Sequence, residues 1–370
     1  MWTFTLLMFF MMIIIGVISG LTPFYGRQST PFGVGVNGKH SFIEERKKKF
    51  AIWNIVVSLL LGLPLFAFPF LEGTETVDMW APIYTVFSMF GFMIFTFVLY
   101  VKFRKDVLEW REILPTEQQT SKKKVVIDMN YHQKLTTRSN FTFFIWQILI
   151  VLITIAVSLL FYERIPAEIP INYDYNFEVS HTIEKSLWGV LALPLLQILM
   201  IPIFIYSNHA IIQSKQKLSP IDPKGASEMS RRFRKAWSNF LFYTTILTQL
   251  LISGLTLFSF FGKPQLNWLF VAVIILYLVI MLGGSIYLTF KYGQAGEKLL
   301  EGDQYYADPE EDEKWLLGMI YYNKEDPSLF VEKRFGVGTT MNIGNRKAWL
   351  FVFGLILFVV ISLVWTYLLV

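Results

Sequence analysis

The sequence has 370 residues, of which 54% are hydrophobic and only 16% are charged, against about 25% charged in soluble domains. Its formal net charge is +5, and it contains no cysteine. This composition excludes an ordinary soluble domain, a disulfide framework and a cysteine-ligated metal site. The excess of cations requires no nucleic acid as partner, because the cations lie beside apolar segments, where they face anionic lipid.

Apolar segments that approach or exceed the length of about 18 residues needed to cross a bilayer recur along the chain. We therefore predict an all-α polytopic membrane protein with about eight transmembrane helices. The predicted spans are 2–21, 51–71, 80–101, 141–162, 187–207, 240–261, 268–290 and 348–370. The first span has no basic segment before it, so we interpret it as a membrane helix and not as a secretory signal.

The cations predict the orientation of these helices. All but three of the 33 Lys and Arg residues lie in the connections 22–50, 102–140, 208–239 and 291–347. The positive-inside rule places these connections in the cytoplasm and both termini outside. We expect a multi-pass membrane protein.

The predicted spans contain no ionisable residue, whereas ion-coupled transporters usually place one inside the hydrocarbon. Neutral polar residues do occur there, and we expect them to form hydrogen bonds between helices. The alternative is a polar path for a substrate. The residues concerned are Asn54, Gln147, Gln197 and Gln249.

Two of the predicted helices contain proline pairs, Pro64 with Pro69 and Pro194 with Pro202. The predicted topology runs these two helices in opposite directions, as in transporters built from inverted repeats, whose sites form where helices break. The alternative interpretation is that both pairs are structural kinks.

Neither the histidines nor the acidic residues form a recognisable metal pattern. The four histidines lie in separate connections, and the acidic run 308–313 lacks the spacing of a calcium loop. We interpret that run as a solvated linker. No nucleophile, base and acid can be grouped from the sequence, so we expect no enzyme, no catalytic residue, no metal and no cofactor.

The stretch "FGVGVNGK", residues 32–39, has the glycine spacing of a dinucleotide-binding turn. No buried strand precedes it, and the position about 20 residues on, where the ribose-binding acid belongs, falls inside a predicted span. We therefore interpret the match as accidental.

The letters "FGVG" return at 335–338, among predicted strands at 319–322, 329–331 and 339–343. We predict a small cytoplasmic β-element before the last helix, built from both copies; the alternative is two unrelated turns.

The segment "RIPAEIPINYDYNFEVSHTIEKS", residues 164–186, lies between two predicted spans. It resembles the membrane domain of unknown function numbered sixteen forty-eight, found in the bacterial SdpI-type toxin-immunity and signalling proteins. Pro170, Asp174, Lys185 and Ser186 fit the family pattern, but Asn172 stands where the family usually has histidine. The resemblance implies a protein that can bind a toxin peptide and hold a cytoplasmic regulator at the membrane. A function that needs the histidine is not implied.

The segment 315–345 resembles a second uncharacterised domain, numbered fifty-eight oh-eight. The matching residues are Trp315, Gly318, Tyr321, Tyr322, Asn323, Asp326, Pro327, Phe330, Val331, Arg334, Gly336, Gly338, Thr340 and Asn342. We expect seven of them to offer a docking site for a cytoplasmic regulatory protein: Tyr321, Tyr322, Asn323, Asp326, Arg334, Gly336 and Gly338.

The predicted outer loop 163–186 supplies the candidate ligand-binding residues Asn172, Tyr173, Asp174 and Tyr175. Aromatic rings flanked by carboxylates suit a cationic, partly apolar peptide. The alternative is an aromatic belt at the membrane interface.

We thus expect a non-enzymatic, multi-pass protein of the bacterial plasma membrane for immunity to, or sensing of, an external toxin or peptide. The alternative is a transporter or permease for a peptide or lipophilic compound. The predicted regions are 1–140 with three helices, 141–210 with the SdpI-like unit, 211–290 with two helices, 291–347 with the β-element and 348–370 with the last helix.

Overall fold

The computed structural model describes residues 2–71, 74–114, 128–173, 179–215, 222–262, 267–299 and 309–369. Seven of its helices are long and apolar enough to cross a membrane. They overlap seven of the predicted spans, and helix α9 overlaps the eighth. The helices are α1 (Trp2–Tyr25), α2 (Ser41–Gly62), α3 (Thr74–Ile113), α5 (Asn140–Leu160), α6 (Leu187–Gln213), α7 (Pro223–Phe261), α8 (Asn267–Tyr292) and α9 (Arg346–Leu369). The prediction of a multi-pass, mainly helical membrane protein is confirmed.

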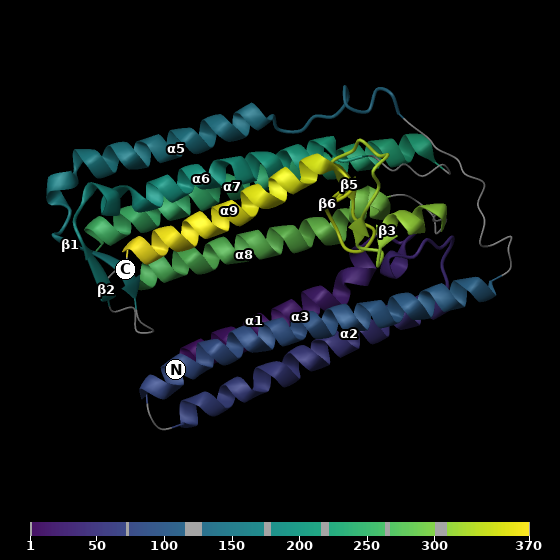
Figure 1. Ribbon diagram of the computed structural model, residues 1–370, viewed down its shortest axis with the longest axis horizontal. Coiled ribbons are helices and arrows are strands. Elements are labelled where there is room, and N and C mark those ends of the chain that lie inside the picture. The colour runs from purple at the N-terminus through teal and green to yellow at the C-terminus, as the bar shows by residue number, and fades with distance from the viewer. Residues whose placement is uncertain are drawn as a thin grey trace.

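The helices form two bundles, α1–α3 and α5–α9 (Figure 1). Helix α1 begins and helix α9 ends at the same end of the molecule as the hairpin of strands β1 (Glu168–Tyr173) and β2 (Val179–Glu184). We call this the hairpin end. The opposite end, which we call the loop end, carries the short 3₁₀ helix η1 (Pro31–Gly33) and the strands that precede α9. Both predicted outer termini therefore lie together with the predicted outer loop.

Three helices extend well beyond their predicted spans, because hydropathy detects only the apolar part of a helix. Helix α7 has 39 residues and begins at Pro223, where the sequence predicts a connection. Asp222 caps it by accepting a hydrogen bond of 3.0 Å from the Gly225 amide, and proline suits the first helical position. Helices α2 and α3 likewise continue into charged segments at the loop end.

The two proline pairs do not have the same effect. Helix α2 passes at Leu63 into the 3₁₀ helix η2 (Leu63–Phe70), which contains Pro64 and Pro69. Helix α6 continues through both Pro194 and Pro202. The expected break is therefore present in one helix and absent from the other, which weakens the comparison with an inverted repeat.

Three small antiparallel sheets complete the fold. Before α9, strand β3 (Trp315–Leu316) pairs with β4 (Ile320–Tyr321), and β5 (Phe330–Glu332) pairs with β6 (Thr339–Met341). The predicted β-element is confirmed. The sequence did not predict the β1–β2 hairpin, because Pro170 within the run argues against a strand interior.

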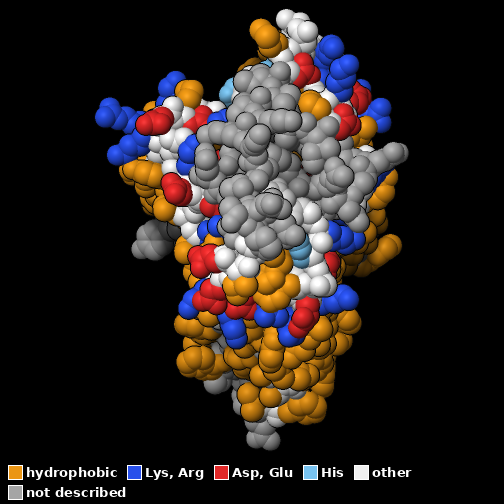
Figure 2. All heavy atoms as spheres, turned by 90° about the vertical axis from the view of Figure 1, so that its right-hand side faces the viewer, with side chains coloured by type: hydrophobic (Ala, Val, Ile, Leu, Met, Phe, Trp, Pro, Cys, Tyr) orange, Lys and Arg blue, Asp and Glu red, His pale blue; other side chains and the backbone are white. Residues whose placement is uncertain are grey.

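The largest buried cluster is aromatic and lies at the loop end. Phe32, Phe50, Tyr100 and Phe103 are all buried in it, and Phe335 packs against it. Around this cluster, the loop end gathers Lys, Arg, Asp and Glu side chains, while hydrophobic side chains cover the sides of the helices (Figure 2). The charged elements of the loop end are thus built on an apolar base that joins α2 and α3 to the turns of the β3–β4 and β5–β6 hairpins.

Candidate functional site

The two "FGVG" copies lie against each other at the loop end. The Phe32 and Phe335 rings stack with centroids 5.9 Å apart. The Thr30 hydroxyl donates to the Arg334 carbonyl at 2.9 Å. The first copy forms η1 and not a strand, while the second connects β5 to β6. Neither sequence interpretation was therefore fully right: the copies form one packed unit, but only the second is part of a sheet.

Close packing at this junction requires glycine at position 33. Gly33 has φ of +73°, and a Cβ there would lie 2.6 Å from the Gly318 carbonyl oxygen. The Tyr100 hydroxyl donates to the carbonyls of Phe32 at 3.0 Å and Leu317 at 2.8 Å. Helix α3 thereby fixes η1 to the turn between β3 and β4.

A buried ion network surrounds Glu332 on β5. Its carboxylate accepts from Arg27 at 2.5 Å and from Arg234 of α7 at 3.2 Å, and Arg27 also pairs with Glu297 at 3.1 Å. Burial opposes the charge of Arg27, but Glu297 and Glu332 outweigh it and raise the pKa of its guanidinium. We call these four residues the Glu332 network: Arg27, Arg234, Glu297 and Glu332. The network has two charges of each sign and joins the two bundles.

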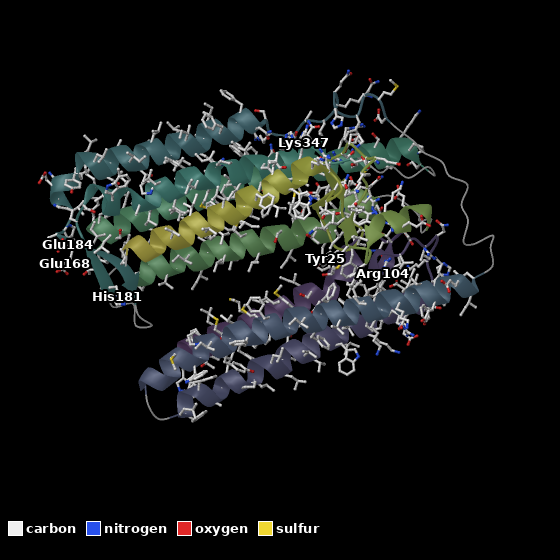
Figure 3. The ribbon with its side chains drawn as sticks, in the orientation of Figure 1. Tyr25, Arg104, Glu168, His181, Glu184 and Lys347 are labelled. Atoms are coloured by element: carbon white, nitrogen blue, oxygen red, sulfur yellow. The ribbon has the colours of Figure 1, made fainter. Side chains whose placement is uncertain are left out.

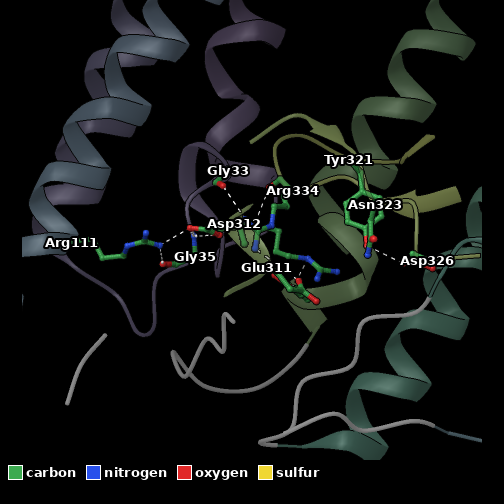
Figure 4. A network of polar contacts seen from close by, with 12 residues as sticks. Gly33, Gly35, Arg111, Glu311, Asp312, Tyr321, Asn323, Asp326 and Arg334 are labelled. Carbon is green, nitrogen blue, oxygen red and sulfur yellow. Dashed lines mark hydrogen bonds and ion pairs between the residues drawn. The ribbon is translucent and has the colours of Figure 1, made fainter. Parts of the chain in front are cut away.

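A second network surrounds Asp312 (Figure 4). Its carboxylate pairs with Arg334 and, at 2.5 Å, with Arg111 of α3, and it accepts from the Gly35 amide at 3.2 Å. The Asp312 side chain is only 10% exposed. The interpretation of 308–313 as a solvated linker is therefore wrong for Asp312, because arginines distant in the sequence neutralise it; residue 308 lies outside the described residues.

A third polar group surrounds Asp326, in the connection between β4 and β5. The Asp326 carboxylate accepts from Lys215 at 2.7 Å and from the Tyr321 hydroxyl at 2.9 Å. Burial raises the pKa of Asp326, but hydrogen bonds from Lys215 and Ser328 outweigh it and lower that pKa from 3.8 to about 2. Burial, together with Asp326, raises the pKa of Tyr321 to about 12. Asp326 is thus ionised and Tyr321 neutral at physiological pH.

The seven residues expected to dock a cytoplasmic protein occupy different environments. Tyr321, Asp326 and Arg334 are buried in the contacts above, whereas Tyr322 is 40% exposed. The remaining three are Asn323, whose amide donates to Asn342, and Gly336 and Gly338, which have positive φ in the turn after β5. The structure thus gives most of these side chains partners within the chain, and docking stays a prediction.

The hairpin end presents a different site (Figure 3). Glu168 of β1 lies directly opposite Glu184 of β2, and both are exposed, as is His181. The Thr182 hydroxyl donates to Glu168 at 3.2 Å. The hairpin is anchored because Lys185 donates to the Ile165 carbonyl at 3.0 Å. Sequence reasoning counted Glu184 among the carboxylates of the outer loop but missed Glu168 and the pairing of the two, since only the strand register brings them together.

Two of the four candidate ligand-binding residues fall on this hairpin. Asn172 and Tyr173 belong to β1, where they lie opposite His181 and Val179. Asp174 and Tyr175 lie outside the described residues. The structure thus places half of the predicted ligand site at the tip of the hairpin.

The neutral amides lie inside the helix bundles, and all four are fully buried. Gln197 of α6 donates to the Gln249 carbonyl of α7 at 2.8 Å, and Gln249 donates to Gln147 of α5 at 3.3 Å. Thr96 of α3 donates to Asn54 of α2 at 2.6 Å. These contacts are the expected hydrogen bonds between helices. Among the described residues, the side-chain oxygens of Gln197 and Gln249 accept no hydrogen bond.

No three His, Asp or Glu side chains of the described ranges gather as ligands of a metal ion. The dinucleotide spacing also has the wrong context. Helix α2 does begin three residues after Gly38, but η1 precedes the glycines where a strand is needed.

Two family matches coincide with the two sites. Residues 149–198 match the Domain of unknown function (DUF1648), and this stretch covers part of α5, the β1–β2 hairpin and the first part of α6. Residues 324–349 match the Family of unknown function (DUF5808), and this stretch covers β5, β6 and the start of α9. The resemblances to these two domains are confirmed. Neither the curated proteins nor the solved structures gave a match.

Proposed function

We propose that this chain is a non-enzymatic protein of the bacterial plasma membrane, similar to SdpI, that binds an external cationic peptide at the hairpin end. The observation that carries the proposal is the pair Glu168 and Glu184, opposite each other on an exposed, anchored hairpin. Like charges directly opposite in a sheet are destabilising. A cationic ligand relieves that repulsion, and exposed Trp188, beside the hairpin, offers aromatic contact area.

The packing of the hairpin supports a sensing role. Ile165 and Ile169 are buried against Val190 of α6 and Phe260 of α7. Helix α7 is about 58 Å long and carries Arg234, which pairs with Glu332 at the loop end. A ligand that shifts the hairpin would therefore press on a continuous helix that reaches the Glu332 network. The apolar side chains of Leu316, Leu317 and Ile320, all exposed on the β3–β4 hairpin, give a cytoplasmic regulator a surface to bind.

Survival of cells exposed to a panel of cationic antimicrobial peptides tests the proposal. Cells that express the double variant Glu168→Gln and Glu184→Gln should lose protection at normal protein abundance. The matched control is Glu109→Gln with Glu313→Gln, which removes two exposed carboxylates at the loop end. Equal protection by both double variants would contradict ligand binding at the hairpin.

A transporter is the second candidate, and one observation favours it. The unpaired side-chain oxygens of Gln197 and Gln249 are buried where α6, with its two prolines, meets α7, and polar groups beside such helices form transport sites in other folds. Uptake of labelled peptides into vesicles that contain the protein, and its loss in Gln197→Leu, would favour this function.

A further inference from the structure

The junction of α1, α2 and α8 at the loop end gathers three cations. Arg27 pairs with Glu297, and the Lys47 ammonium donates to Gln28 at 2.6 Å and to Glu44 at 2.7 Å. Lys298 lies on the 3₁₀ helix η5 (Gln294–Leu299). Within the described ranges, no carboxylate pairs with the Lys298 ammonium. Lys47 lies nearby, because Gln28, which accepts from Lys47, donates through its backbone amide to Glu297 at 3.2 Å. Burial and, after it, the positive charge of Lys47 lower the pKa of Lys298.

The position of Lys298 is fixed by the backbone around it. Ala295 and Gly296 both have positive φ, which turns η5 back against α7, and a Cβ at Gly296 would lie 2.6 Å from the Met229 carbonyl oxygen. Gly293 also has positive φ, and a Cβ there would lie 2.8 Å from Cγ of Lys298. The chain thus adopts three left-handed residues within one turn, which holds the lysine stem in place.

The Lys298 ammonium lies where the apolar surfaces of the two bundles end. It is 5.2 Å from the centroid of Phe290, near the end of α8, and that ring is 5.7 Å from the Tyr25 ring, the last residue of α1. The most apolar stretch of α8 has none of its residues buried within the chain. A cation at the end of such an exposed apolar helix lies at the depth of lipid headgroups.

We propose that this junction is a binding site for one anionic phospholipid, whose phosphate lies between Lys298 and Lys47 and whose acyl chains lie along α8. A phosphate offsets the repulsion between the two ammonium groups. Lys298 has three N–H donors to offer, and Lys47 keeps one beyond the two already used. The exposed face of α8 distinguishes a lipid from a soluble anion, which would leave that apolar surface unused.

The test uses the purified full chain in detergent micelles. The apparent affinity for phosphatidylglycerol is measured by native mass spectrometry and by the melting temperature from tryptophan fluorescence. Phosphatidylcholine with the same acyl chains and inorganic phosphate serve as the other two ligands. Phosphatidylglycerol should bind and stabilise the protein, and the other two should not.

The variant Lys298→Gln should bind phosphatidylglycerol about fivefold more weakly, because one lysine near an anionic lipid surface contributes about that factor. Lys298→Arg should bind within about twofold of the unchanged protein, since it keeps the charge. Lys347→Gln is the matched control, an exposed lysine at the same end on α9, and should bind normally. All three should melt normally without lipid.

Three results would overturn the proposal. Unchanged affinity in Lys298→Gln would place the lipid elsewhere. Equal stabilisation by phosphatidylcholine would remove the role of charge. Equal stabilisation by inorganic phosphate would make the ligand a free anion and not a lipid.

Discussion

The substitution Glu332→Gln tests whether the Glu332 network joins the two bundles. The Glu332 side chain is only 5% exposed and bridges Arg27 and Arg234, whose side chains are 4% and 1% exposed. A neutral amide there leaves the network with one uncompensated buried charge. Removing one partner of a buried pair costs about 3–5 kcal/mol.

The remaining contacts place the expected loss at the lower limit of that range. Arg27 keeps Glu297, while Arg234 keeps its bond of 3.1 Å to the Ile212 carbonyl and the ring of Tyr131. We therefore expect Glu332→Gln to lower the free energy of unfolding by about 3 kcal/mol, measured by denaturant titration in mixed micelles. When Glu332→Gln is introduced into a protein that is cut between residues 114 and 128, its two parts should no longer associate on pull-down.

Two further variants make the reasoning refutable. Adding Arg234→Met to Glu332→Gln removes the uncompensated charge. The double variant should regain most of the lost free energy of unfolding, because buried ion pairs can be replaced by apolar side chains at little cost. Glu313→Gln, an exposed carboxylate nearby, should change stability by less than about 0.5 kcal/mol. A loss below about 1 kcal/mol for Glu332→Gln, with the two parts still associated, would show that the network does not join the bundles.

Gly33→Ala should lower the free energy of unfolding by at least about 2 kcal/mol, and with it the melting temperature and the abundance of the protein, because the added Cβ would meet the Gly318 carbonyl oxygen. The control is Gly91→Ala, because Gly91 has open space around it in α3. Ionised Asp326 contributes stability above its unfolded pKa, and this is lost as pH falls from about 4 toward 2. Asp326→Asn should therefore flatten the pH dependence of unfolding in that range. In intact cells, an impermeant thiol reagent should label cysteines placed at Gly73, Asn176 and Gln265, and should not label those at Lys122, Gly225 and Asn323.

The sequence was sufficient for the helices but not for their full length. Apolar runs located every span, since hydrocarbon requires long apolar helices. The charged first part of α7, which includes Arg234, was predicted as a connection because hydropathy gives no weight to amphipathic helix. Strands β4, β5 and β6 were predicted from their β-branched and aromatic residues, whereas β3 was not predicted and Pro170 concealed the β1–β2 hairpin.

The candidate sites depend on contacts that a single sequence does not reveal. Arg27 and Glu332 are 305 positions apart, and Asp312 and Arg111 are 201 apart. No periodicity links such residues, so Asp312 was predicted to be solvated. The repeated "FGVG" was the one sequence signal of this junction, and it correctly directed attention to the segments that meet there.

The contacts described between the two bundles lie at the loop end, and in Figure 1 the ribbons of α1 and α8 diverge from there toward the hairpin end. Helix α1, with 24 residues, is about 36 Å long and packs along α2, with Gly20 against the Ala51 backbone, so the bundle α1–α3 would tilt as one body about the loop end. A tilt of about 10° would move its far end by about 6 Å while the ion pairs stay closed. Membrane thickness alters helix tilt, so a change in thickness would alter the separation of the two bundles most at the hairpin end.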